Sequence, residues 1–139
     1  MYPIKSDAGE KRSKYFFPLI IGAIWNLIFG SLGLFNLQLS NSLFLNSITP
    51  VSKIIANEIW WSVVLLFGVG YGIVGYANHK FRFFITFGAI GKIALFFLVS
   101  YLWLKSAATS FAIIVATGDL LWAIYFIYYL FSTKEYGFL

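Results

Sequence analysis

The sequence predicts an all-α integral membrane protein, a four-helix bundle whose helices run up, down, up and down. Of its 139 residues, 60% are hydrophobic and only 11% are charged, which is more apolar side chain than a soluble domain of this length can bury. Four apolar runs are each long enough to cross a hydrocarbon core of roughly 30 Å, which takes about 20 helical residues. The chain has no cysteine, which excludes disulfides and thiolate metal sites.

The first predicted span covers residues 15–35 and follows a basic tail at 1–14. This start has some features of a signal peptide, but its apolar run exceeds the usual ~7–15 residues and no A-x-A-like site follows, so we expect the span to be retained. The connection at 36–57 is rich in Ser and Asn with apolar residues between them. It is too polar and too short to cross, and we expect an extracytoplasmic loop, a surface-lying segment or a re-entrant loop.

The other predicted spans are 58–76, 81–104 and 109–131, followed by a tail at 132–139. The links "ANHKFR" (77–82) and "KSAATS" (105–110) read as tight turns. Links this short join antiparallel neighbours, which predicts the alternating direction of the four helices.

Basic residues predict the orientation. Lys53 and Lys105 alone fall on one side, and seven basic residues fall on the side of the termini: Lys5, Lys11, Arg12, Lys14, Lys80, Arg82 and Lys134. Positive charge is retained in the cytoplasm, so we expect both termini to be cytoplasmic. The same residues fit contact with anionic lipid better than a nucleic-acid site, and no nucleic-acid partner is expected.

A polar centre is predicted at mid-depth. Lys92 lies about eleven residues into the third span, or roughly 16 Å at ~1.5 Å per residue, and Asn26 and Asp119 reach a similar depth in theirs. A charge facing lipid there would cost about 2.5–3.5 kcal/mol on insertion scales. Small residues share the faces of all three side chains, and such faces mark close helix contacts. We therefore expect the three to meet at the midplane.

Three interpretations of this centre remain open. It is a structural ion pair that fixes which helices meet, a site that recognises the polar group of a ligand, or a relay for protons or ions. Glu58, at the outer end of the second span, is a candidate group for passing protons to such a relay. The alternative for Glu58 is an interfacial carboxylate favoured by the helix dipole.

The second span carries the glycine-rich string "FGVGYGIVGY". Gly68 and Gly72 have the small-xxx-small spacing of close helix contacts. A groove for a flat apolar molecule is the alternative, and its candidate residues are Trp25, Gly68, Tyr71 and Gly72. If the protein forms an oligomer, this helix is the candidate interface.

Other chemistry finds little support in the sequence. His79 is the single histidine, we expect it to be solvated in its turn, and one histidine cannot form a multi-histidine metal site. The serines lack a paired base for nucleophilic catalysis. We predict no catalytic residue, no metal site and no cofactor.

Several strings resemble one family. "WNLIFG", "FGVGYGIVGY", "FRFFITFGAIGKIALF" and "GDLLWAIYFIYYL" are similar to a group of small uncharacterised bacterial proteins with four transmembrane helices, DoxX-like in layout. The pairs of that group match here as Trp25-Asn26, Gly70-Tyr71, Gly91-Lys92 and Gly118-Asp119, although "ANHKFR" replaces a more acidic link. The resemblance implies a bacterial inner membrane and a polar centre, and it implies no reaction.

The functional expectation is a non-enzymatic membrane protein. It binds a hydrophobic or lipid-like molecule, or it acts as a membrane accessory subunit, and the polar centre orients the ligand or the helices. The alternative is a proton-coupled small transporter or channel. The expected partners are membrane lipids, an apolar ligand, and further copies of the chain or a larger membrane complex.

Overall fold

The computed structural model describes residues 13–137, and regular structure in this range is helical. Four of the helices are long and apolar enough to cross a membrane. The all-helical membrane fold is therefore confirmed, and the chain is a multi-pass membrane protein. In chain order the elements are α1 (Phe16–Phe35), α2 (Leu37–Phe44), the 3₁₀ turn η1 (Ser52–Ile54), α3 (Glu58–Tyr76), α4 (Phe83–Leu104), α5 (Ser110–Ser132) and the 3₁₀ turn η2 (Lys134–Tyr136).

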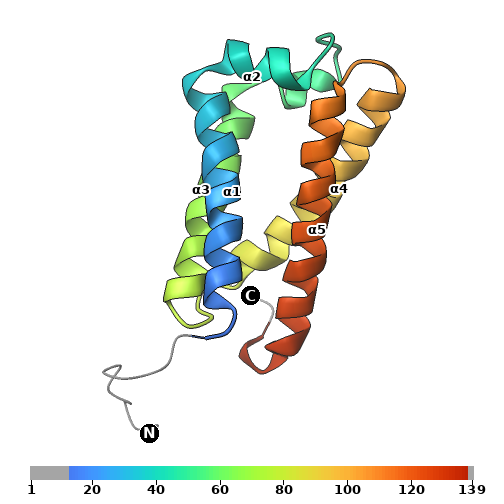
Figure 1. Cartoon of the computed structure of the whole chain (residues 1–139). Coiled ribbons are helices and arrows are strands. Elements are labelled where there is room, and N and C mark those ends of the chain that lie inside the picture. Colours follow the sequence, from blue (N-terminus) through green and yellow to red (C-terminus); the bar gives the residue numbers. More distant parts are fainter. Residues whose placement is uncertain (1–12, 138–139) are drawn as a thin grey trace, which may run out of the picture.

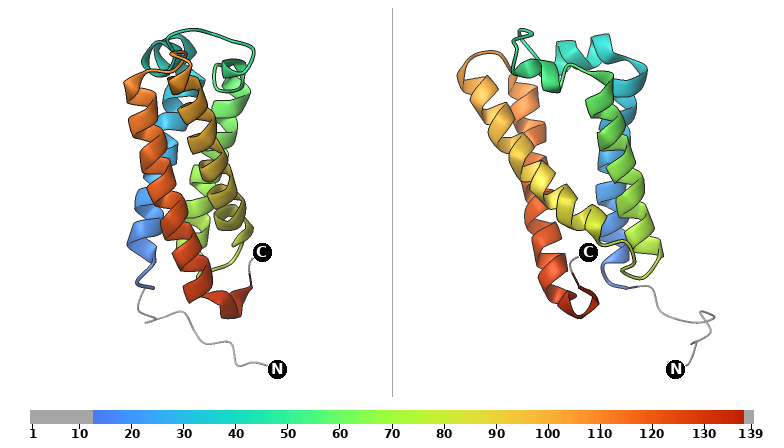
Figure 2. Two further views of the ribbon diagram at one scale, coloured as in Figure 1. Left: turned by 90° about the vertical axis from the view of Figure 1, so that its right-hand side faces the viewer. Right: turned by 180° about the vertical axis from the view of Figure 1, so that it is seen from behind.

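The long helices form two pairs. Helix α1 packs along α3, and α4 packs along α5 (Figure 1). Residues 77–82 link the pairs, and α3 and α4 approach each other near this link and diverge toward α2 (Figure 2). Both described ends of the chain lie at the end of the bundle that holds this link (Figure 1). We call it the terminal end, and we call the opposite end the α2 end.

Polar side chains set where the helices begin. The first N–H groups of a helix lack acceptors within it, so Asn and Thr are favoured just before the first turn. Asn36 accepts from the Leu39 N–H at 3.1 Å, which starts α2 directly after α1 ends. Asn57 accepts from Ile59 at 2.9 Å and Thr109 from Ala112 at 3.1 Å. These caps place the starts of α3 and α5 at the α2 end.

The 36–57 connection is a strap across the α2 end. Helix α2 lies across the tips of the long helices (Figure 1), so the surface-lying alternative describes it. The strap is hydrogen-bonded to the α4–α5 loop: the Asn46 amide donates to the carbonyls of Ser106 and Ala108 at 3.2 and 3.1 Å. Thr109 Oγ1 donates to the Leu43 carbonyl at 2.5 Å. The strap therefore connects the two helix pairs at this end.

The terminal end is closed by Arg82. This residue lies in the 77–82 link, where the sequence places it on the side of the termini, and it is only 1% exposed. Its guanidinium donates to the carbonyl of Leu130 at 3.1 Å and also bonds Thr133 and the carbonyl of Gly137. Cationic Arg82 thus satisfies carbonyls at the C-terminal end of α5, where the helix dipole favours positive charge. Residues 134–136 fold back as η2 in this contact.

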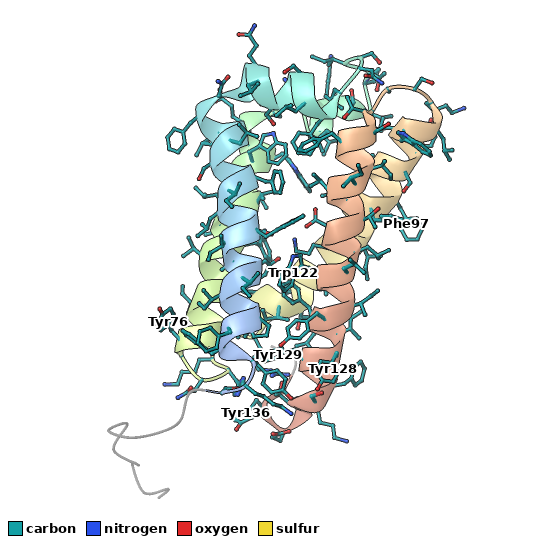
Figure 3. All side chains as sticks on the ribbon, in the orientation of Figure 1. Tyr76, Phe97, Trp122, Tyr128, Tyr129 and Tyr136 are labelled. Carbon is teal, nitrogen blue, oxygen red and sulfur yellow. The ribbon has the colours of Figure 1, made fainter. Side chains whose placement is uncertain are left out.

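The prediction that His79 is solvated is also wrong. His79 is half-buried, and its Nδ1 lies 2.5 Å from the hydroxyl of Tyr129. Its ring also lies 4.7 Å from that of Tyr136 between centroids. Figure 3 shows Tyr129 and Tyr136 together at the terminal end. The backbone of His79 is left-handed, with φ of 71°, and this unusual conformation turns the imidazole toward the bundle instead of toward water.

Glycines allow α1 and α3 to approach closely. A Cβ on Gly30 would lie 2.8 Å from the Leu65 backbone nitrogen, and one on Gly68 would lie 3.0 Å from Asn26 Cβ. Neither position has room for a side chain. Gly72 also faces α1, 3.9 Å from Ala23 Cβ. The glycine face of α3 thus packs against α1 within the chain, and the expectation that this helix forms an interface between copies stays a prediction.

The outer surface is apolar and the interior has two clusters. Large side chains such as Ile59, Phe97 and Ile114 are 72%, 66% and 68% exposed, as lipid-facing residues are, and Figure 3 shows Phe97 pointing away from the bundle. One buried cluster lies at the α2 end. The other lies at the terminal end and is closely packed: Val74, Ile85, Phe126 and Tyr129 are each 0% exposed.

Candidate functional site

Three polar side chains meet near the middle of the bundle. Lys92 of α4 donates from Nζ to Asn26 Oδ1 of α1 at 2.8 Å and forms a salt bridge with Asp119 of α5. Their exposed fractions are 6%, 5% and 6% for Lys92, Asn26 and Asp119. The structure therefore brings together the three residues that the sequence places at one depth. We call them the polar cluster.

Two further groups hold the polar cluster in place. The indole N–H of Trp25 donates to Asp119 Oδ1 at 3.2 Å, and the Asn26 amide donates to the Val64 carbonyl of α3 at 3.1 Å. The amide of Asn26 thus accepts from Lys92 and donates to α3, so its orientation is fixed. Through these bonds the cluster joins all four long helices.

Two glycines make room for the aromatic neighbours of the cluster. A Cβ on Gly118 would lie 2.7 Å from the Trp25 ring, so the absence of a side chain lets this ring reach Asp119. A Cβ on Gly88 would lie 2.2 Å from the Tyr71 hydroxyl. The Tyr71 ring in turn lies 5.9 Å from Lys92 Nζ, near the limit for a cation–π contact. The glycine next to Asp119 in the sequence thus has a steric role, because it leaves space for the Trp25 ring that binds Asp119.

The charges of the cluster balance each other. Lys92 and Asp119 are opposite in sign and hydrogen-bonded, as buried charges must be in a low dielectric. Removing one partner would leave an unpaired charge, whereas the intact pair is neutral overall. The pair therefore leaves no net charge at mid-depth.

A cavity of about 160 Å³ lies next to the polar cluster, on the side toward α2. All four long helices contribute to its wall, and the three cluster residues form part of that wall. The rest is mainly aromatic and aliphatic. Near the α2 end the wall includes Phe44, Ile55, Trp60, Trp61, Val99 and Ala112. An apolar space with a few converging polar groups is the usual form of a small-molecule site.

The four residues predicted for a ligand groove do not all lie at this cavity. Trp25 and Tyr71 line the cavity, but Gly68 and Gly72 do not, because their face of α3 packs on α1. The glycines that line it are Gly88 and Gly91 of α4. The small-xxx-small spacing of the second span therefore indicates packing of α3 on α1, and the cavity lies on another side of α3.

Glu58 stands apart from this site. It is exposed in the first turn of α3 and does not line the cavity. Its position at a helix N-terminus suits a carboxylate, since the dipole favours negative charge there. Within residues 13–137, no group of three or more His, Cys, Asp and Glu residues could hold a metal ion.

The sequence did not indicate two indole donors. The Nε1 atoms of Trp60 and Trp61 are buried and have no hydrogen-bond partner among the described residues, and both residues line the cavity. Paired tryptophans near the end of a span read as an interfacial belt. Only the packing of the rings shows that they turn inward.

Comparison of the chain with protein-family models, curated proteins and solved structures found no match. The resemblance to DoxX-like proteins therefore stays a prediction.

Proposed function

We propose that this membrane protein binds a hydrophobic or lipid-like molecule in the cavity between its helix pairs. The observation that carries the proposal is the cavity itself, a hollow at mid-bundle whose apolar wall includes the buried polar cluster. Apolar walls supply affinity and a few fixed polar groups supply orientation in sites of this kind. The polar cluster would orient the bound molecule.

The size of the cavity supports this proposal. Protein interiors are close-packed, and voids larger than a water molecule are few. The cavity here has about 160 Å³, similar to the apolar cavity of about 150 Å³ that stays dry and takes up benzene. An empty cavity also forfeits dispersion contacts along its wall. An apolar group that fills it restores them.

Binding is better supported than transport for a single chain. A path across the bundle would have to continue from the polar cluster to the terminal end. The described side chains there include Val74, Ile85 and Phe126, each 0% exposed and apolar. These residues are closely packed and leave no space that continues the cavity in this direction.

The orientation of the protein belongs to the proposal as well. We infer a bacterial inner membrane, as the resemblance implies, with both termini in the cytoplasm. Lys14, Lys80 and Lys134 lie at the terminal end of the bundle, whereas Lys53 and Lys105 lie at the α2 end, and positive residues are enriched on the cytoplasmic side. A green fluorescent protein fused to the C-terminus should fluoresce, and a phosphatase fused there should be inactive. The reverse pattern would refute the orientation.

Native mass spectrometry of the gently solubilised protein tests the binding proposal. We expect a stoichiometric adduct, identified after organic extraction as an apolar molecule. Ala116 is 2% exposed and lines the cavity, so Ala116→Leu should fill the space and remove the adduct.

Ala94→Leu is the matched control. Ala94 lies on the exposed surface of α4 and does not line the cavity, so the same added volume should leave the adduct in place. An empty wild-type protein, or an adduct that survives in folded Ala116→Leu, would contradict the proposal.

A further inference from the structure

The wall of the cavity carries no net charge. Among residues 13–137, Lys92 and Asp119 are its only charged lining residues, and they neutralise each other in a salt bridge. A charged ligand would find no free counter-ion there, and an unpaired ion in a low dielectric is strongly disfavoured. The chemistry of the wall therefore selects an uncharged molecule.

Two residues of the wall also carry hydrogen-bond donors that are not in use. Trp60 and Trp61 line the cavity, and their Nε1 atoms are buried and have no acceptor among the described residues. An indole N–H can only donate, and a buried donor without an acceptor is destabilising. Trp61 is only 6% exposed. A ligand that supplies an acceptor satisfies these groups.

Trp61 is fixed against α1. A Cβ on Gly33 would lie 2.0 Å from the Trp61 ring, so this ring rests directly on the backbone of α1 at Gly33. The indole cannot turn toward α1 to find another acceptor. A donor held in place before binding loses little conformational entropy when the ligand arrives.

The cavity opens sideways between α3 and α4. Its wall includes Val63 and Phe87, which are 41% and 53% exposed on the outer surface of the bundle. Gly91 lies at the same opening, exposed, and a Cβ added there would meet nothing within 4 Å. Helices α3 and α4 diverge on this side (Figure 2). Unlike Gly30 or Gly68, Gly91 does not serve a close helix contact; it leaves space.

The other routes are covered. Phe44 and Ile55 of the 36–57 strap close the α2 end, at 6% and 3% exposed. The closely packed cluster closes the terminal end. The opening between α3 and α4 lies along helices long enough to span the membrane, so it faces lipid.

We propose that the cavity receives an uncharged apolar molecule from within the bilayer, through the opening at Gly91, and that the molecule carries a hydrogen-bond acceptor for Trp60 and Trp61. This inference rests on the proposed binding function and adds the chemical class of the ligand and its route.

Four probes of equal chain length test the ligand class. Methyl laurate is uncharged with a carbonyl acceptor, dodecane has no acceptor, laurate is an anion and dodecylammonium is a cation. Native mass spectrometry of the full chain, delipidated and titrated with each probe, should show one equivalent of methyl laurate. We expect methyl laurate to bind about 3- to 10-fold tighter than dodecane, the range that one added hydrogen bond supplies, and both ions to bind more weakly than the ester.

Substitution of the indoles tests the donors. Trp61→Phe and Trp60→Phe each remove an N–H and keep an aromatic ring, and the double variant should lose the preference for methyl laurate over dodecane. Trp103→Phe is the control, because Trp103 is 45% exposed and does not line the cavity. It should keep the wild-type preference.

The route is tested by rate. A brominated fatty-acid methyl ester quenches tryptophan fluorescence, so its uptake from vesicles into the reconstituted protein can be followed in time. Gly91→Leu should slow uptake several-fold because the side chain narrows the opening, and Ala94→Leu on the same helix should not.

The outcomes separate the two proposals. If no probe binds stoichiometrically, or if Ala116→Leu binds as the wild type does, the binding function itself is wrong. If binding is blocked by Ala116→Leu, the function stands. The further inference is then overturned by tighter binding of an ion, by an ester preference that survives in the double tryptophan variant, or by equal uptake rates in Gly91→Leu and Ala94→Leu.

Discussion

Burial in the middle of the bundle removes the charge of Lys92 from water, and the contacts of this side chain offset the desolvation cost. Asp119 balances its charge, and the Asn26 oxygen accepts a second hydrogen bond at 2.8 Å. The indole N–H of Trp25 also donates a hydrogen bond to Asp119. A lysine in a membrane needs both a counter-ion and acceptors, and here α5 provides the first and α1 the second.

The pair should behave as a unit under mutation. Lys92→Met or Asp119→Leu alone should cost about 3–5 kcal/mol, because each leaves one buried charge without its partner. The double variant should recover most of this loss, since no charge remains to be buried. Unfolding of the detergent-solubilised protein by a denaturing detergent measures the cycle. A double variant that loses the sum of the single effects would show that the two residues act independently.

His79 should make the stability depend on pH. It lies in the 77–82 link, outside the spanning helices, and burial lowers the pKa of its imidazole below the ordinary 6.5. Arg82 lowers this pKa further, while Glu135 opposes the shift. As the pH falls, the imidazole is protonated in the unfolded chain before it is protonated in the folded protein. The folded protein therefore has its full stability above pH 6.5 and loses part of it below this pH.

The measurement is the melting temperature between pH about 7.5 and about 5, the range in which histidine titrates. On acidification, the melting temperature of the wild type should fall further than that of His79→Gln, whose side chain cannot be protonated. Equal losses in the two proteins would show that His79 does not contribute.

At the scale of elements, glycine has two distinct roles. In α1, Gly30 allows the backbone of α3 to approach, as the 2.8 Å distance from its added Cβ to Leu65 shows. In α4, Gly91 faces open space. Both are glycines within spanning helices, and only their neighbours distinguish them.

The two roles predict opposite effects of one substitution. Gly30→Ala should destabilise the protein by about 1–3 kcal/mol, because the added methyl overpacks a backbone contact. Gly91→Ala should be neutral or stabilising by up to about 1 kcal/mol, since alanine is the better helix former. Thermal unfolding in one detergent compares them. A loss of stability in Gly91→Ala would mean that this space is filled in the folded protein.

Regular periodicities explain what could be predicted from the sequence. Rise per residue is constant in a helix, so the shared depth of Asn26, Lys92 and Asp119 followed from counting. Spans were placed within two residues of α1, α3, α4 and α5 because apolar length is constrained by the membrane.

The features that could not be predicted from the sequence depend on the direction of side chains in loops and at helix ends. His79 stands in a polar link and was predicted to be solvated, and only the contact with Tyr129 shows that it turns inward. The burial of neighbouring Arg82 was not indicated either, because it depends on the fold-back of residues 134–136. The free indoles of Trp60 and Trp61 were missed for the same reason. A sequence does not specify which way a tryptophan near a membrane interface turns.

At the scale of the whole molecule, the bundle has a closely packed half and a hollow half. Tyr71, next to the polar cluster, borders both: it belongs to the buried cluster at the terminal end and also lines the cavity. The difference follows from the helix axes, since α3 and α4 are close at the terminal end and divergent toward α2 (Figure 2). Trp122 lies between α1 and α5 on the packed side (Figure 3), 3.4 Å from a Cβ added at Gly22.

Two alanines of α5 test this asymmetry. Ala116 lines the cavity, whereas Ala123 is 0% exposed and lies outside it. Ala123→Leu should cost about 1–3 kcal/mol by overpacking, and Ala116→Leu should cost less than about 1 kcal/mol because the cavity accommodates the new methyl groups. Equal losses in denaturant unfolding would mean that both halves are equally packed.

The pairing of the helices also allows the structure to be assembled in two steps during synthesis. Helices α1 and α3 are neighbours in space with only the strap between them in the chain, so they can associate before α4 leaves the ribosome. The Asn26 amide then already rests on the Val64 carbonyl. Lys92 and Asp119 emerge later, on the second pair, with an acceptor already positioned for the lysine. The cavity between the pairs exists only once α4 and α5 have packed against α1 and α3. The newly synthesised protein therefore forms its cavity last, while it is surrounded by lipid.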